Sequence, residues 1–209
     1  MNQDQTVHVI GDSISIHYGP YLEQYLSPWC GYSRKTGRVG NLDEPDGANG
    51  GDSAMVLAYL QQCLAAGQRW DVLLVNCGLH DVKRANGQLQ VELAQYQANL
   101  AAIFELARQL AAQSVWVRTT PVIDHLHNAR MADFKRFNAD VERYNAAADR
   151  LAAAACDWQI DLNGFCRSLG GAEIFADHVH FTDDIRRLQG AFIAGHLLAR
   201  LGLATPTRR

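Results

Sequence analysis

The chain has 209 residues, of which 48% are hydrophobic and 20% charged, and its formal net charge at pH 7 is −3. This composition is typical of one soluble globular domain, here residues 1–209, and it argues against nucleic-acid binding, which usually shows an excess of basic residues. The N-terminus lacks the basic and apolar regions of a signal peptide, and no segment approaches the roughly 18 apolar residues of a membrane span, so we expect a cytoplasmic protein without membrane contact.

Short apolar segments that alternate with helical ones predict a parallel sheet covered by helices on both faces. The first segment, residues 7–10, ends at a glycine, as a buried parallel strand does where it reaches its carboxyl end. Open α/β sheets bind ligands at that end, so the polar residues that follow are candidates for a site. Further strands are predicted within residues 32–39, 71–78, 114–121 and 156–162.

Apolar side chains at every third or fourth position predict amphipathic helices between and after these strands. Ser53 is a candidate N-cap for one helix, and Thr182 or Asp183 for the last. Segment 27–52 is rich in glycine and is predicted to be mostly loop, of a length that often lines a site. The predicted helices cover residues 53–66, 88–111, 134–151 and 184–202.

Three polar blocks that lie far apart in the sequence contain the groups that a nucleophilic hydrolase needs. They are GDS at 11–13, GDS at 51–53 and DHVH at 177–180. Such an enzyme requires a hydroxyl nucleophile, a base, a group that orients the base, and donors for the developing oxyanion. Each of these roles has a candidate among the residues of the blocks.

With a further block, GLHD at 78–81, the sequence resembles the SGNH (GDSL-type) hydrolases, a family of serine esterases and lipases. The blocks that carry the resemblance occur in the family's order and span almost the whole chain, as GDSIS at 11–15, NGGDS at 49–53, GLHD at 78–81 and DHVHFT at 177–182. The resemblance implies an α/β fold, a three-layer α/β/α sandwich of flavodoxin-like type with about five parallel strands. It also implies a Ser-Asp-His triad and an oxyanion hole, with no metal and no cofactor.

The resemblance assigns the triad to Ser13, Asp177 and His180. Ser13 is the expected nucleophile, His180 the base that takes its proton and returns it to the leaving alcohol, and Asp177 the group that holds the imidazole. The oxyanion hole is assigned to the N–H groups of Ser13 and Gly51 and to the side chain of His80, with the Gly51 N–H expected to be free. The alternatives are a serine in a turn for Ser13, an acidic loop that caps the last helix for Asp177 and His180, and an ordinary loop glycine for Gly51.

His80 departs from the family pattern, because the family has asparagine at this position. Asparagine Nδ2 and histidine Nδ1 are the same number of bonds from Cβ, so a neutral imidazole protonated on Nδ1 presents its N–H where the amide would. We therefore predict that His80 is an oxyanion donor. Its need for one tautomer or for a proton introduces a pH dependence that an amide lacks.

Asp12, His125 and Arg118 are predicted to bind substrate. His125 follows the fourth predicted strand and Arg118 ends it, at the edge of the sheet where the site is expected. The alternatives are a solvated loop for His125 and a structural ion pair for Arg118.

The motif Asp-His-x-His occurs twice, at 124–127 and 177–180, and suggests a metal-dependent hydrolase as an alternative. Histidine pairs with nearby carboxylates are common zinc ligands, and His80 could complete such a set. Against this alternative, nothing supplies a clear third ligand, and Ser13 would have no role.

The expected function is hydrolysis of carboxylic esters through an acyl-Ser13 intermediate, with a small-molecule ester as the partner and no oligomeric state predicted. Short acyl or O-acetyl esters, which carbohydrates can carry, are favoured over membrane lipids because the sequence has no long apolar lid or amphipathic surface helix. A non-catalytic module that binds glycan or acyl groups is the second alternative, distinguished by its failure to form a covalent adduct.

Overall fold

The computed structural model describes residues 5–42 and 44–203 of the chain. Its main sheet has the strand order β2-β1-β3-β6-β7, and each neighbouring pair is parallel. A short antiparallel hairpin, β4-β5, lies outside this sheet. The strands are β1 (Thr6–Ile10), β2 (Gly31–Arg34), β3 (Trp70–Val75), β4 (Arg84–Ala85), β5 (Gln88–Leu89), β6 (Ala111–Val117) and β7 (Trp158–Ile160).

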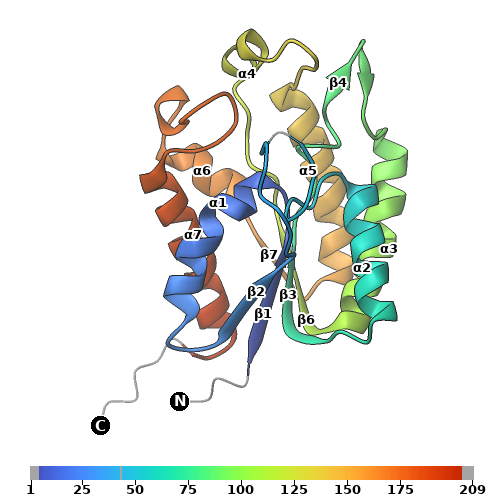
Figure 1. Cartoon of the computed structure of the whole chain (residues 1–209), viewed down its shortest axis with the longest axis vertical. Helices are drawn as coiled ribbons and strands as arrows, with labels where there is room; N and C mark the ends of the chain where they lie inside the picture. The colour runs from blue at the N-terminus through green and yellow to red at the C-terminus, as the bar shows by residue number, and fades with distance from the viewer. Residues whose placement is uncertain (1–4, 43, 204–209) are drawn as a thin grey trace.

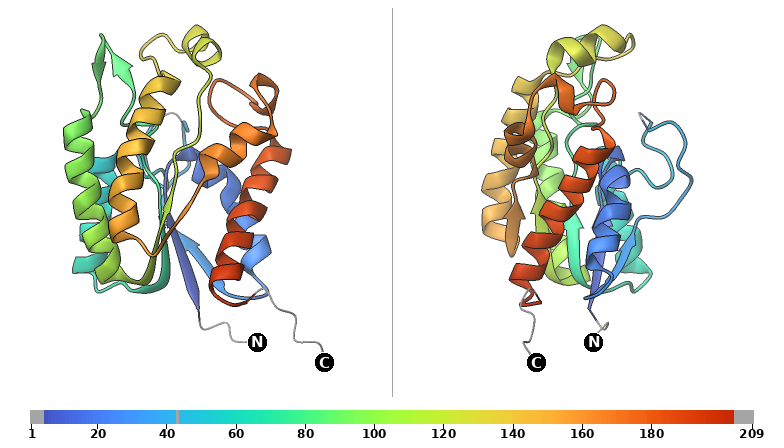
Figure 2. Two further views of the ribbon diagram at one scale, coloured as in Figure 1. Left: turned by 180° about the vertical axis from the view of Figure 1, so that it is seen from behind. Right: turned by 90° about the vertical axis from the view of Figure 1, so that its left-hand side faces the viewer.

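Helices cover both faces of the main sheet, so the predicted three-layer α/β/α sandwich is confirmed (Figures 1 and 2). Helices α1 and α7 pack against each other on one face, and α3 packs against both α2 and α5 on the other. Helix α6 packs against α7. The helices are α1 (Ser13–Leu26), α2 (Ser53–Ala65), α3 (Leu93–Leu110), α4 (Asp124–Arg130), α5 (Asn138–Ala155), α6 (Leu162–Leu169) and α7 (Asp183–Arg200), with a short 3-10 turn at Ala172–Ile174.

The carboxyl ends of the parallel strands meet at the upper edge of the sheet in Figure 1. The segments that follow these strands lie at this edge, with α4 and the β4-β5 hairpin above it. Because the strands are parallel, residues that follow β1 and β3 are brought together although they are far apart in the sequence. Among the described residues, no helix combines the length and the apolar character needed to span a membrane.

The interior of the sheet is mostly apolar but contains a buried histidine. His8 lies in β1 and is buried, with Nδ1 at 2.8 Å from Ser33 Oγ and Nε2 at 2.9 Å from the Tyr59 hydroxyl. Its ring also stacks on Trp70, at 4.0 Å between centroids. Burial, with a smaller contribution from the Arg34 charge, lowers the pKa of His8 to about 4, so the imidazole is neutral in the folded protein at neutral pH.

Several helix boundaries differ from the sequence prediction, and the helix predicted over residues 134–151 covers Asn138–Ala155. The helix predicted to start at residue 88 begins at Leu93, because Asn86 and Gly87 adopt positive φ angles of 51° and 81° and turn the chain into the β4-β5 hairpin. The N-cap of α2 is Asp52 rather than Ser53, since the Asp52 side chain accepts from an N–H of the first turn. Thr182 is the N-cap residue of α7, as predicted.

Candidate active site

Ser13 stands at the point where β1 passes into α1. It is the first residue of the helix, and Asp12 is the N-cap, with its Oδ1 accepting from the Ile14 N–H at 2.9 Å. Ser15 Oγ donates to the Asp12 carbonyl at 2.7 Å and tightens the same turn. Ser13 is therefore held at a helix N-terminus, where the exposed N–H groups and the helix dipole favour negative charge.

Asp12 has a structural role in this turn. The carboxyl group was predicted to bind substrate, but it is buried and its Oδ1 caps α1. Burial raises its pKa, while the hydrogen bond from Ile14 and the charges of Arg136 and His180 oppose that rise.

A tight loop before α7 places His180 beside Ser13. Within this loop Asp177 Oδ1 accepts from the N–H groups of Val179 and His180, each at 2.8 Å. Asp177 Oδ2 lies 2.8 Å from His180 Nδ1, and His180 Nε2 lies 2.9 Å from Ser13 Oγ. The loop is closed by a bridge between Phe175 and Phe181. Three residues from two ends of the chain thus form one continuous hydrogen-bonded series.

The charge state of Asp177 defines the histidine tautomer. Burial would raise the pKa of Asp177, but hydrogen bonds from the His180 ring and from the N–H groups of His180 and Val179 outweigh it and hold the pKa well below its usual value. The ionised carboxylate accepts the proton on Nδ1 of His180, so Nε2 is left as an acceptor for the Ser13 hydroxyl.

The second block is tied to the first by its backbone. The Gly50 N–H donates to the Gly11 carbonyl at 2.9 Å, which fixes the glycine loop against the end of β1. Gly51 has φ +73°, and a Cβ there would lie 2.5 Å from Met55 Sδ, so the position requires glycine. Its N–H was expected to be free, and this is wrong: it donates to Asn49 Oδ1 at 2.9 Å. The cause is a local turn in which the buried Asn49 side chain folds over the next two residues.

The third block is tied to the second by Asp81. Both carboxylate oxygens of Asp81 accept from the Ser53 N–H, at 2.9 and 3.1 Å, at the start of α2. Burial raises the pKa of Asp81 to about 7. His80 is buried in the same loop after β3. Asp81 therefore orders the segment that carries His80.

Residues 9–188 match the sequence profile of the GDSL-like Lipase/Acylhydrolase family. The chain belongs to this family. The predicted SGNH (GDSL-type) membership is thereby confirmed, and the protein is a carboxylic ester hydrolase. No curated protein matches the sequence.

Solved structures with the same fold include other esterases. The acetyl xylan esterase AlAXEase has a TM-score of 0.68 and 15% identity, covering 92% of this chain and 99% of that one. The lipase/acylhydrolase from Enterococcus faecalis has a TM-score of 0.69 and 16% identity, covering 94% and 96%. The acetylxylan esterase Axe2 from Geobacillus stearothermophilus has a TM-score of 0.66 and 16% identity, covering 98% and 97%. At these identities the likeness supports the fold of the GDSL-like hydrolase and nothing finer.

Two further residues of this GDSL-like hydrolase, Arg118 and His125, were predicted to contact substrate. Arg118 forms ion pairs with Asp149 at 3.1 Å and Asp161 at 2.7 Å, so its guanidinium links α5 to the start of α6. His125 is exposed on α4. The ion-pair alternative therefore describes Arg118, whereas substrate binding by His125 stays a prediction.

The two Asp-His-x-His segments are engaged in other ways than metal binding. Both ring nitrogens of His180 face protein groups, Asp177 and Ser13, and His127 Nε2 lies 2.8 Å from Arg136 Nη1. Over residues 5–42 and 44–203, no group of three or more His, Cys, Asp or Glu side chains is arranged to hold a metal ion.

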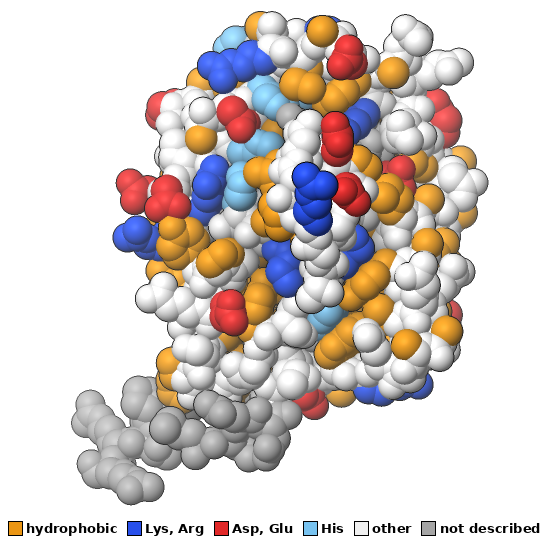
Figure 3. Space-filling model, viewed as in Figure 1, with side chains coloured by type: hydrophobic (Ala, Val, Ile, Leu, Met, Phe, Trp, Pro, Cys, Tyr) orange, Lys and Arg blue, Asp and Glu red, His pale blue; other side chains and the backbone are white. Residues whose placement is uncertain are grey.

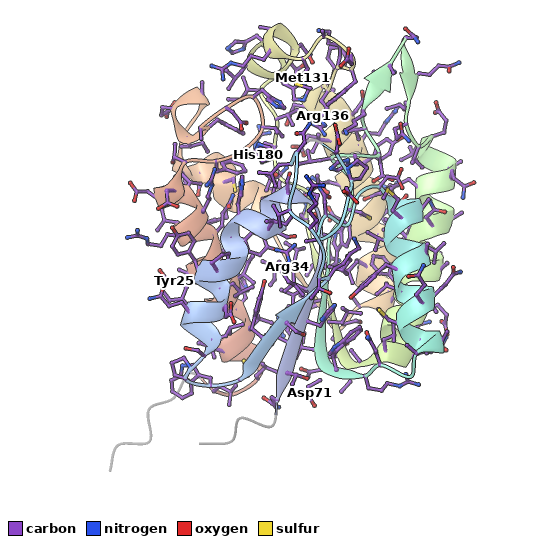
Figure 4. All side chains as sticks on the ribbon, in the orientation of Figure 1. Tyr25, Arg34, Asp71, Met131, Arg136 and His180 are labelled. Carbon is purple, nitrogen blue, oxygen red and sulfur yellow. The ribbon has the colours of Figure 1, made fainter. Side chains whose placement is uncertain are left out.

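Two residues near the GDSL-like hydrolase's candidate triad were missed by the sequence analysis. His17 lies one helical turn after Ser13, with its ring centroid 4.9 Å from that of His180, and burial lowers its pKa to about 4. Arg136 is buried beyond the end of the sheet (Figure 4). The four-residue spacing from Ser13 was a usable signal for His17, whereas nothing local in the sequence marks Arg136. Histidine side chains gather near the upper end of the face shown in Figure 3.

A cavity of about 330 Å³ opens between α1 and the loop that follows β2. Its lining includes Ile16 and Pro20 of α1 together with Tyr32 and Val39. Most of its lining is apolar, and Arg34 and Lys35 contribute its cationic groups. None of the residues that line it belongs to the candidate triad.

Proposed function

We propose that this protein hydrolyses small carboxylic esters through an acyl-Ser13 intermediate. The observation that carries the proposal is the series Asp177–His180–Ser13, with separations of 2.8 and 2.9 Å between the successive polar atoms. His180 Nε2 accepts the Ser13 proton as Oγ attacks the ester carbonyl, and Asp177 stabilises the imidazolium that results. His180 then donates the proton to the leaving alcohol.

Three groups stabilise the oxyanion in this proposal. The Ser13 N–H is at the N-terminus of α1 and has no partner among the residues that the structure describes. His80 supplies an imidazole N–H from the loop after β3. The Gly51 N–H contributes when it exchanges Asn49 Oδ1 for the substrate oxygen, because one N–H donates well to only one acceptor at a time.

Deacylation uses the same groups in reverse. Water enters after the alcohol has left, and His180 Nε2 takes its proton as the water oxygen attacks the acyl carbonyl. The bond between the acyl carbon and Ser13 Oγ then breaks, His180 returns the proton to Oγ, and the carboxylic acid leaves. The depressed pKa of Asp177 keeps the carboxylate ionised throughout, so the imidazole is held in one orientation in both half-reactions.

The proposed substrates are short acyl or O-acetyl esters, including those on carbohydrate. Two of the structural neighbours are acetyl xylan esterases, which favours an acetyl group as the first candidate. The chemistry requires no metal or cofactor.

The test is hydrolysis of p-nitrophenyl esters of increasing acyl length and of an acetylated xylo-oligosaccharide, with Ser13→Ala as the control and a parallel assay in chelator. The expected result is turnover that is fastest for acetate, is abolished by Ser13→Ala, and is unchanged by chelation. Loss of turnover on chelation favours the metal-dependent alternative. Binding of the oligosaccharide without release of acetate favours the non-catalytic module.

A further inference from the structure

We propose that Arg136 is a positioning residue for the third block: its buried guanidinium anchors the loop that carries His80 to the segment around α4. The inference rests on the proposed function, in which His80 donates to the oxyanion. Arg136 lies between α4 and α5, more than fifty residues after the loop that it holds.

The burial of Arg136 is the first observation. Its exposed fraction is 2%, although arginine is almost never fully buried unless its charge is paired or hydrogen-bonded. Desolvating a guanidinium costs free energy that nearby hydrogen bonds must offset. A charge kept at this position, beside the sheet edge where the candidate site lies, points to a role in that site.

The contacts of the guanidinium connect the loop that carries His80 to helix α4. Nε donates to the Leu79 carbonyl at 2.7 Å, and Leu79 is the residue before His80. Nη1 lies 2.8 Å from His127 Nε2, and because a guanidinium only donates, that nitrogen is the acceptor. His127 is therefore neutral and carries its proton on Nδ1, which faces Asn128 Oδ1 at 3.2 Å.

The backbone of Arg136 is held as firmly as its side chain. Its N–H donates to Asn128 Oδ1 at 2.9 Å, and its carbonyl accepts from Asn128 Nδ2 at 2.9 Å. The guanidinium also lies over the Phe134 ring, at 5.0 Å from the centroid. With both ends fixed, the side chain can transmit the position of this segment to the Leu79 carbonyl and so to the adjacent His80.

The position of His80 controls its value as a donor, since a displacement of about 1 Å in a catalytic group costs on the order of 10²-fold in rate. Arg136 also acts on the first block, because its charge is among the influences that lower the pKa of Asp12, the N-cap of α1. Lysine cannot replace it, because a single ammonium lacks the planar fork that reaches two fixed acceptors at once.

The experiment is a double-mutant cycle between Arg136→Lys and His80→Ala, read by kcat and KM on p-nitrophenyl acetate. Arg136→Lys should lower kcat by about 10 to 100-fold with KM changed by less than about threefold. His80→Ala alone should cost about 10² to 10³-fold in kcat. The double variant should lie within about threefold of His80→Ala, because a donor that is absent can no longer be displaced.

The matched control is Arg150→Lys, which makes the same change on an exposed face of α5 and should leave kcat unchanged. Additive losses in the double variant, or a lowered Tm with unchanged kcat in Arg136→Lys, would overturn the inference. If Arg136→Lys does not fold, His127→Leu removes one acceptor of the same guanidinium and should show the same non-additivity with His80→Ala. Failure of the proposed function is recognised separately, since wild-type protein would then show no Ser13-dependent turnover at all.

Discussion

Replacing Asp177 with asparagine should disable the candidate triad while leaving its loop almost intact. The amide oxygen can still accept from the N–H groups of Val179 and His180, which now bond to Asp177 Oδ1 at 2.8 Å. The amide nitrogen then faces His180 Nδ1 in place of the carboxylate oxygen at 2.8 Å. Two donors cannot face each other, so the imidazole changes to the tautomer protonated on Nε2.

The changed tautomer prevents His180 from activating Ser13. With a proton on Nε2, the ring donates toward Ser13 Oγ across the 2.9 Å separation and no longer accepts the hydroxyl proton. Loss of the correct tautomer in such a triad costs on the order of 10⁴ in kcat, which corresponds to about 5 kcal/mol of transition-state stabilisation. KM should change by less than about threefold, because the carboxylate does not touch substrate.

The assay is kcat on p-nitrophenyl acetate between pH 5 and 9, with Asp184→Asn as a matched control at the exposed start of α7. The low pKa of Asp177 means that its carboxylate stays ionised over this whole range, so the acid limb of the wild-type profile belongs to other groups. Folding of both variants is checked by Tm. A folded Asp177→Asn variant with kcat within about tenfold of wild type would refute the reasoning about the tautomer.

Three further predictions concern other positions. The native pKa of His8, about 4, lies below its unfolded value of 6.5, so the unfolded chain binds the proton more tightly and stability is lost as pH falls from 6.5 toward 4. At 1.36 kcal/mol per unit this amounts to about 3 kcal/mol, and urea denaturation of wild type and His8→Phe across this range should show a shallower pH dependence in the variant; equal slopes would contradict the shift. Gly51→Ala should destabilise the fold by about 1 to 3 kcal/mol and lower kcat, because alanine at φ +73° is strained and its Cβ meets Met55 Sδ; a fully stable and active variant would count against this geometry. Arg118→Gln should cost up to about 1 kcal/mol in unfolding free energy and leave KM for p-nitrophenyl acetate within about twofold, whereas a tenfold rise in KM would return Arg118 to the substrate site.

The sequence was most informative where the signal is local. The apolar runs of β1, β3 and β6 and the α/β/α layering were predicted correctly, because strands buried on both faces are continuously apolar. The start of α3 was predicted five residues too early. Residues 88–92 fit a helical period, but the Asn86-Gly87 turn places them in the β4-β5 hairpin and in the segment that follows it. The helical period alone does not distinguish a helix from the turn that precedes it.

In the candidate site too, some features were predictable from sequence motifs and others were not. The motif order was enough to select Ser13, Asp177 and His180, which the structure brings into hydrogen-bond contact. The bond between Gly51 and Asn49 depends on how one side chain folds within a loop, and sequence pattern carries no information about that choice. The role proposed for Arg136 was not predicted from the sequence, because it depends on a contact with Leu79, 57 positions earlier in the chain.

The substrate-binding prediction for Arg118 shows that sequence pattern does not identify the partner of a charged side chain. A basic residue at the end of a strand looks the same in sequence whether it faces a substrate or two carboxylates. The packing of α5 and of the start of α6 against β6 and β7 determines which of these partners the side chain contacts.

The measurement that tests the central claim most directly is intact-mass spectrometry after treatment with a fluorophosphonate ester, which reacts with an activated serine hydroxyl. We expect a single covalent adduct on wild-type protein, unchanged by prior chelation, absent from Ser13→Ala and formed far more slowly on Asp177→Asn. No adduct on wild type, or the same adduct on Ser13→Ala, would contradict the assignment of Ser13 as the nucleophile.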